Sequence, residues 1–148
     1  MIHYQRTLNI DATPAALWAV ISRFMHIDEF APQIQSVDAL TEGNDGVGSK
    51  RRCNFTDGSS LVEEVTEWQA NRSYRVQLLE MTSMPLHDAY AELVLEALEN
   101  GQTKVIWSMD YQVKYGPFGW LLGHTMMKLM MKKVLDSNLQ SLADKVKT

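Results

Sequence analysis

Two oppositely charged residues, Arg51 and Glu63, flank a short turn at Thr56–Gly58, and the neighbours expected on their face of the strands, Cys53, Phe55, Leu61 and Val65, are apolar. Glycine at the third turn position suits a three-residue hairpin loop whose last residue is left-handed. The register set by this loop pairs Arg51 with Glu63 and Cys53 with Leu61. A guanidinium and a carboxylate opposed among apolar side chains are typical of a ligand-orienting site. The alternative is an ordinary cross-strand ion pair that closes the floor of the core.

Further chemically useful side chains are expected on the same inward face. His87 and His124 could transfer protons near neutral pH, although a lone histidine is more often a hydrogen-bonded wall residue. Tyrosine and tryptophan can pack by their rings and meet a ligand with their polar ends, although core packing is favoured for Trp107. Glu63 and His87 are the candidate catalytic residues. The candidate ligand-binding residues are Arg51, Cys53, Phe55, Leu61, Glu63, Tyr74, His87, Ala91, Trp107, Tyr111, His124, Met127 and Met131.

Metal, nucleotide and other cofactor sites are not expected. Cys53 is the single cysteine, and the segment from His26 to Glu29 has no second histidine at metal-ligand spacing. No glycine-rich phosphate loop is visible. The neighbours Glu63 and Glu64 cannot act as an acid and base pair, because adjacent strand residues face opposite sides of a sheet.

The composition is that of a folded protein, and we expect a single domain over residues 1–148. Hydrophobic residues make up 45% and charged residues 22% of the 148 residues, and the net charge is −4. The negative charge argues against a nucleic-acid partner. A single cysteine, no secretory leader and no long uncharged apolar run predict a cytoplasmic protein without a membrane span.

The elements that must position these residues can be read from hydrophobic periodicity. Alternation over Ile2–Ile10, broken at Arg6, predicts a strand, and Thr13 followed by Pro14 predicts the start of the first of two short helices. From Ile34 to Val113, extended segments are separated by short turns, which allow only antiparallel neighbours. We count six strands, including the first.

A second hairpin provides a further register. Glycine again stands third in the turn at Glu99–Gly101, so that Leu95 faces Val105, Leu93 faces Trp107 and Ala91 faces Met109. A two-residue turn would instead place Lys104 on the apolar face. We therefore expect the three-residue turn.

A long helix is predicted from Gly116 and Pro117 to about Val146. Its second half presents one apolar stripe, made by Met131, Leu135, Leu139, Leu142 and Val146. Its first half is apolar on nearly all sides. The residues expected to face outward there, and to form a homodimer, a partner-protein contact or a membrane-facing lid, are Leu122, Met126, Leu129 and Met130. The alternative is that loops around Phe24 to Phe30 cover them.

Five sequence stretches can be compared with known families: Asp11–Ile21, Phe30–Pro32, Gly46–Arg52, Val62–Trp68 and Thr103–Trp107. Together with the order of elements, they resemble the START-like polyketide cyclase/dehydrase superfamily. The resemblance covers the whole chain and implies a helix-grip fold of the α+β class, with a curved antiparallel sheet around a long C-terminal helix. It also implies a deep cavity, used by different members to carry lipids, sense hormones, cyclise polyketides or bind protein partners. Hormone-sensing members use the equivalent glutamate and arginine at the pocket.

Small side chains favour a hollow between sheet and helix. Ala89, Ala91 and Ala97 share one strand face, although methionines of the helix could fill the space. The leading hypothesis is a binding protein for a lipid, polyketide or aromatic metabolite. One alternative is a polyketide cyclase, aromatase or dehydratase in which Glu63 or His87 is the base and Arg51 polarises a carbonyl. Another is a protein-interaction module that uses the apolar helix surface.

Overall fold

The computed structural model describes residues 2–43, 46–81, 86–113, 116–117, 121 and 125–147. Within these ranges, His87 is described by its backbone alone. Strands and helices follow the predicted order. They are β1 (Ile2–Ile10), α1 (Pro14–Ile21), the 3-10 helix η1 (Phe24–Glu29), β2 (Ile34–Ala39), β3 (Lys50–Phe55), β4 (Ser60–Gln69), β5 (Ser73–Leu79), β6 (Leu86–Ala97), β7 (Thr103–Val113) and α3 (Met126–Lys147).

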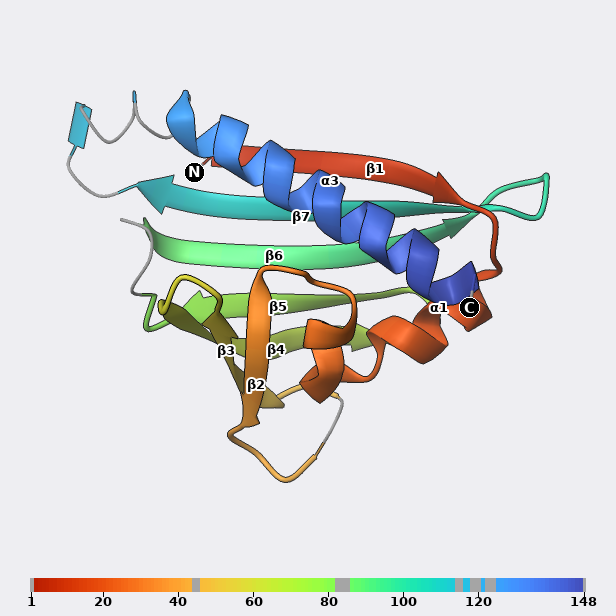
Figure 1. Cartoon of the computed structure of the whole chain (residues 1–148), viewed down its shortest axis with the longest axis horizontal. Helices are drawn as coiled ribbons and strands as arrows, with labels where there is room; N and C mark the ends of the chain where they lie inside the picture. Colours follow the sequence, from red (N-terminus) through yellow and green to blue (C-terminus); the bar gives the residue numbers. More distant parts are fainter. Residues whose placement is uncertain are drawn as a thin grey trace.

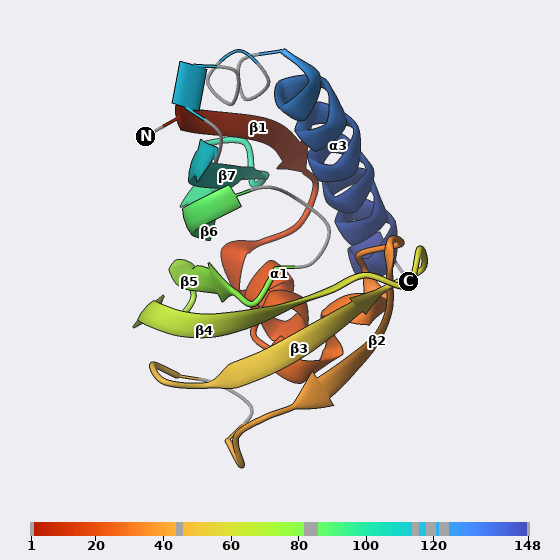
Figure 2. The ribbon, with the colours of Figure 1, turned by 90° about the vertical axis from the view of Figure 1, so that its left-hand side faces the viewer.

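All strands belong to one antiparallel sheet with the order β1-β7-β6-β5-β4-β3-β2. The sheet curves strongly, and α3 runs across its concave side (Figures 1 and 2). This arrangement confirms the expected α+β fold class. The count of six strands was wrong, because the sheet has seven: the five turns between Ile34 and Val113 separate six segments rather than five, and β1 is added to them.

Both predicted hairpin registers are confirmed. Arg51 pairs with Glu63 and Cys53 with Leu61 across β3 and β4. Leu93 likewise pairs with Trp107 and Ala91 with Met109 across β6 and β7. Gly58 and Gly101, the third turn residues, have φ angles of 91° and 84°, in the left-handed region that glycine adopts without strain. The two glycines therefore fix which side chains reach the concave face.

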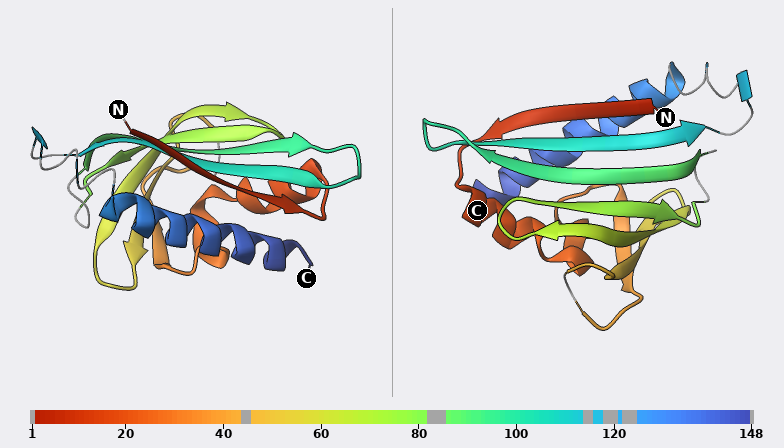
Figure 3. Two further views of the ribbon diagram at one scale, coloured as in Figure 1. Left: turned by 90° about the horizontal axis from the view of Figure 1, so that it is seen from above. Right: turned by 180° about the vertical axis from the view of Figure 1, so that it is seen from behind.

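The short helices close one end of the concave side. α1 begins as expected, because the Thr13 side chain accepts a hydrogen bond from the Ala16 amide at 3.1 Å and Pro14 occupies the first turn. Buried residues of α1 and η1, including Leu17 and Phe24, pack into the core. Viewed from above and from behind, α1 lies near the C-terminal end of α3 (Figure 3).

The long helix α3 begins at Met126. Of the predicted first part of the helical segment, Gly116, Pro117 and Leu121 are helical, Thr125 is in a turn, and residues 118–120 and 122–124 lie outside the described residues. A sequence pattern that is apolar on all sides gives no periodic signal for where the packed helix starts. The predicted stripe is confirmed for its buried members Met131, Leu135, Leu139 and Leu142, and Val146 is half-buried.

The break in the alternation of β1 has a structural reason. The Arg6 side chain pairs with Asp136 on α3, with Nε–Oδ1 and Nη2–Oδ2 distances of 2.7 and 3.1 Å. This bidentate ion pair links the edge strand β1 to α3. Arg6 therefore helps to hold α3 over the sheet.

Candidate functional site

A cavity of about 290 Å³ lies between the β3–β4 hairpin, the central strands, η1 and α3. Seven of the residues predicted from the sequence line it: Cys53, Phe55, Leu61, Glu63, Ala91, Trp107 and Met131. Its volume is at the small end of the range of about 300–1,000 Å³ for small-molecule sites. The sheet and α3 therefore leave room for a compact small molecule.

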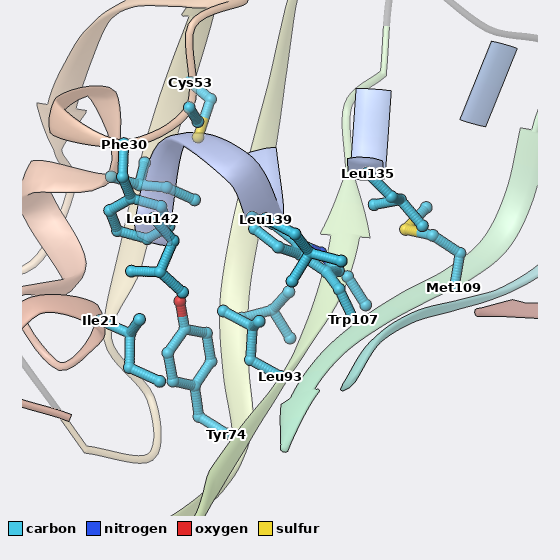
Figure 4. Close-up of a cluster of buried hydrophobic side chains, with 14 of the residues drawn as sticks. Ile21, Phe30, Cys53, Tyr74, Leu93, Trp107, Met109, Leu135, Leu139 and Leu142 are labelled. Atoms are coloured by element: carbon cyan, nitrogen blue, oxygen red, sulfur yellow. The ribbon is translucent and has the colours of Figure 1, made fainter. Parts of the chain in front are cut away.

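Apolar side chains from both layers form most of the wall. Trp107 and Met109 project from β7 toward Leu135 and Leu139 of α3 (Figure 4). Met109, Met130 and Met131 contribute to the wall without filling the hollow. Methionine adapts its shape to its neighbours, so this wall can adjust to ligands of different outline.

The cavity reaches the surface beside the β3–β4 turn. Among its lining residues, Thr56 and Asp57 in the turn and Met130 on α3 are exposed. The Asp57 carboxylate is held in place within the turn, because it accepts hydrogen bonds from the backbone amide and the hydroxyl of Ser59. These hydrogen bonds with Ser59 lower the pKa of Asp57, so it carries a negative charge at neutral pH. A ligand would enter past this carboxylate and an exposed methionine.

The buried ion pair lies at the inner end of the cavity. Arg51 is 1% exposed, and its Nε and Nη2 atoms lie 2.8 and 2.6 Å from Glu63 Oε1. Its Nη1 donates to the Phe24 carbonyl oxygen, and the guanidinium lies 3.8 Å above the centre of the Phe24 ring. Each guanidinium nitrogen is thus engaged within the protein. Glu63 lines the cavity, whereas Arg51 lines only a smaller hollow behind it, beside Tyr74.

Burial and charge determine the protonation states here. Burial opposes the charge on Arg51, but the attraction of Glu63 outweighs it, and the pKa of Arg51 is raised. Burial, reinforced by the negative charge of Glu63, raises the pKa of the Cys53 thiol. Cys53 donates to Glu63 Oε1 at an Sγ–Oε1 distance of 3.4 Å. It is therefore a neutral thiol and not a nucleophile.

Tyr74 packs against the aromatic cluster at the end of the core. Its ring is stacked on Trp68 at a centroid distance of 5.4 Å and meets Phe24 edge-on at 5.9 Å. Burial raises the pKa of Tyr74 to about 12. Its hydroxyl points into the apolar cluster that includes Ile21 and Leu142 (Figure 4) and has no hydrogen-bond partner among the described residues. Tyr74 lines the smaller hollow and not the main cavity.

Two further predicted site residues, Tyr111 and Met127, line neither the cavity nor the smaller hollow. Tyr111 and Met127 are buried but lie near the end where β1 and α3 begin, beyond the hollow (Figure 1). They share the inward face with the site residues, but shared orientation does not place them at the same depth along the sheet. The side chain of His87 and the whole of His124 lie outside the described residues, so their roles remain predictions.

Only one of the three alanines that were expected to leave a hollow lines the cavity. Ala91 lines the cavity, but Ala89 is packed in the core and Ala97 is exposed at the end of β6. Of these three small side chains, only Ala91 therefore borders the cavity. A strand's alternation identifies the face but not the part of it that the helix covers.

Several lining residues were not predicted from the sequence. Ile27 and Ile34 reach the cavity from the segment that follows α1, and Leu78 and Met109 come from the sheet. Asn138 also lines it, from the buried face of α3. Its position three residues after Leu135 was the available signal, because that spacing places it on the apolar stripe.

Two kinds of site are absent from the described part of the chain. It contains no group of three or more histidine, cysteine, aspartate or glutamate residues that could hold a metal ion. None of its helices is both long enough and apolar enough to cross a membrane.

Comparison with known proteins gives the family. Residues 1–147 match the family described as polyketide cyclase / dehydrase and lipid transport. The chain belongs to this family. No curated protein shows significant sequence similarity to it.

Several solved structures have the same fold as this chain over nearly its whole length. The protein XoxI from Bacillus cereus has a TM-score of 0.79 at 18% identity, and the match covers 99% of this chain and 96% of that one. The protein TTHA0849 from Thermus thermophilus has a TM-score of 0.76 at 19% identity, with 98% and 97% covered. Ara h 8.0201 has a TM-score of 0.73 at 20% identity, again with 98% and 97% covered. At these identities the similarity shows the fold alone.

Proposed function

We propose that this protein binds a hydrophobic or amphipathic small molecule, such as a lipid, a polyketide or an aromatic metabolite, between its sheet and α3. The observation that carries the proposal is the cavity of about 290 Å³, with its largely apolar wall and exposed residues at its rim. Burial of a ligand's apolar surface there would supply affinity. The family's description, which includes lipid transport, agrees with this function.

The contacts of the charged residues favour binding over catalysis. Arg51 is engaged by Glu63 and by the Phe24 carbonyl, so it is poorly placed to polarise a substrate carbonyl. Glu63 is ion-paired and Cys53 is a neutral thiol. A cyclase, aromatase or dehydratase would need Glu63 or His87 as a base. That activity remains the alternative, and turnover of a poly-β-keto substrate that is lost in Glu63→Gln would support it.

Binding can be measured through Trp107, which lines the cavity. Titration with 2-naphthol or a medium-chain alcohol is expected to give one saturable site per chain by calorimetry. Native mass spectrometry should show the same one-to-one complex. In Trp107→Phe, the ligand-induced change in tryptophan fluorescence should shrink, while the exposed control Leu40→Ala should behave like the wild type. No saturable binding by any apolar ligand would contradict the proposed function.

Self-association through the start of α3 is a second proposal. Met126, Leu129 and Met130 are 67%, 71% and 43% exposed, and Leu122 lies outside the described residues. Large apolar side chains that gather on one surface favour a homodimer contact. Sedimentation velocity is expected to show a dimer that Leu129→Glu converts to a monomer. A wild-type protein that stays monomeric at high concentration would contradict this proposal.

A further inference from the structure

Two of the polar residues in the cavity wall carry a hydrogen-bond acceptor that receives no hydrogen bond from the described residues. Asn138 is only 1% exposed and lines the cavity, and its Oδ1 has no hydrogen-bond partner among the described residues. A buried acceptor without a partner is unfavourable, so a ligand donor that reaches it would remove this cost. The position of Asn138 on the otherwise apolar stripe of α3 places this residue on the side of the cavity opposite the sheet.

Glu63 supplies a second acceptor from the sheet side. Among the described residues, the hydrogen bonds to its carboxylate from Arg51 and Cys53 both use Oε1. Its other oxygen, Oε2, therefore remains available to accept a hydrogen bond at the cavity wall, where Glu63 lies. An ionised carboxylate accepts and cannot donate.

Positive charge is missing from the part of the wall that the structure describes. Its lining residues include the carboxylates of Asp57 and Glu63 but no lysine, arginine or histidine. Arg51 lies in the smaller hollow behind Glu63, and its charge is already neutralised by that residue. An anionic ligand head would therefore meet two carboxylates and no free cation.

We propose that the cavity selects a ligand whose polar end is a neutral hydrogen-bond donor, such as a phenol or alcohol hydroxyl, and rejects carboxylates. The donor would be held by Asn138 Oδ1 or Glu63 Oε2 while the apolar body packs against Trp107 and the methionines. A cationic head fits less well, because Glu63 is already paired with Arg51 and the surrounding wall is apolar. The inference rests on the proposed function and specifies the class of ligand.

Three ligands of nearly the same shape test the selection. Naphthalene, 2-naphthol and 2-naphthoate differ in their polar group, and at pH 7 the phenol is neutral while the carboxylic acid is ionised. Calorimetry on the unmodified protein is expected to show 2-naphthol binding at least tenfold more tightly than 2-naphthoate, and also more tightly than naphthalene. Equal or tighter binding of 2-naphthoate would overturn the proposal.

A helix variant tests the role of Asn138. Asn138→Leu should reduce the preference for 2-naphthol over naphthalene severalfold and leave naphthalene binding intact, whereas the control Gln140→Leu changes an exposed residue of the same helix and should alter neither. Asn138→Leu is also expected to melt at a higher temperature in the absence of ligand, since it removes the unpartnered acceptor. An unchanged preference for 2-naphthol would overturn the assignment to Asn138. If none of the three compounds binds the wild type, the proposed function itself fails, which differs from binding without selection.

Discussion

Arg51→Met is expected to lower the free energy of unfolding by about 3–5 kcal/mol, because it leaves the Glu63 carboxylate buried without its counterion. Both residues are buried, and the guanidinium contacts the carboxylate, a backbone carbonyl and an aromatic ring. Methionine keeps much of the length of the side chain but none of the charge. Urea unfolding monitored by circular dichroism at pH 7 measures the loss.

The neighbouring strand residues provide a matched control. Lys50 and Glu64 occupy the same hairpin, face the other side of the sheet and form a partly exposed ion pair with an Nζ–Oε1 distance of 3.6 Å. Lys50→Met should cost no more than about 1 kcal/mol, as expected for surface pairs. A similar small loss in Arg51→Met would show that the buried pair is not tightly coupled.

The double variant Arg51→Met, Glu63→Leu separates the two roles weighed for this pair. Without either charge, no unpaired ion remains, and most of the stability lost in Arg51→Met should return. If the double variant still binds 2-naphthol as tightly as the wild type, the ion pair has a structural role and does not hold the ligand. If binding weakens with stability restored, Glu63 contributes to holding the ligand.

The sequence was sufficient for the sheet registers because the turns are governed by local chemistry. Gly58 and Gly101 each adopt a positive φ angle, and this requirement can be recognised from the position of glycine in a turn. Once the hairpin register is set, the opposition of Arg51 and Glu63 follows from the two-residue period of a strand. Elements and contacts that depend on local geometry were therefore predictable.

The extent of the site was not predictable, because it depends on how two distant elements overlap. The patterns of β6 and β7 correctly placed Ala91 and Trp107 on the inward face. They also placed Tyr111 there, which is buried but does not line the cavity. Asn138 was not predicted, because a single polar residue on an apolar helix stripe gives no sign in the sequence of whether its side chain borders a cavity or packs in the core. The break between Leu121 and Met126 at Thr125 could not be predicted, because the sequence of this segment has no clear polar side.

Ala91→Phe is expected to weaken the binding of 2-naphthol by about a hundredfold, which corresponds to about 2.7 kcal/mol of binding free energy. Ala91 lies at the centre of β6 opposite Met109 and lines the cavity, so a phenyl group there would occupy the space of the ligand. Because the ring enters an existing hollow, the cost in stability should stay at or below the range of about 1–3 kcal/mol seen for overpacked cores. Calorimetry and urea unfolding measure the two effects separately.

Ala97→Phe, on the same strand, is the appropriate control. Ala97 is exposed near the end of β6, six residues from Ala91 and on the same side of the strand, but it is not among the cavity-lining residues. The control should therefore bind 2-naphthol like the wild type. If the two variants bind equally well, the ligand lies elsewhere and the cavity under α3 is not the binding site. If only Ala91→Phe loses binding while remaining folded, the affinity depends on the hollow between the sheet and the helix, because the two variants add the same ring to the same strand.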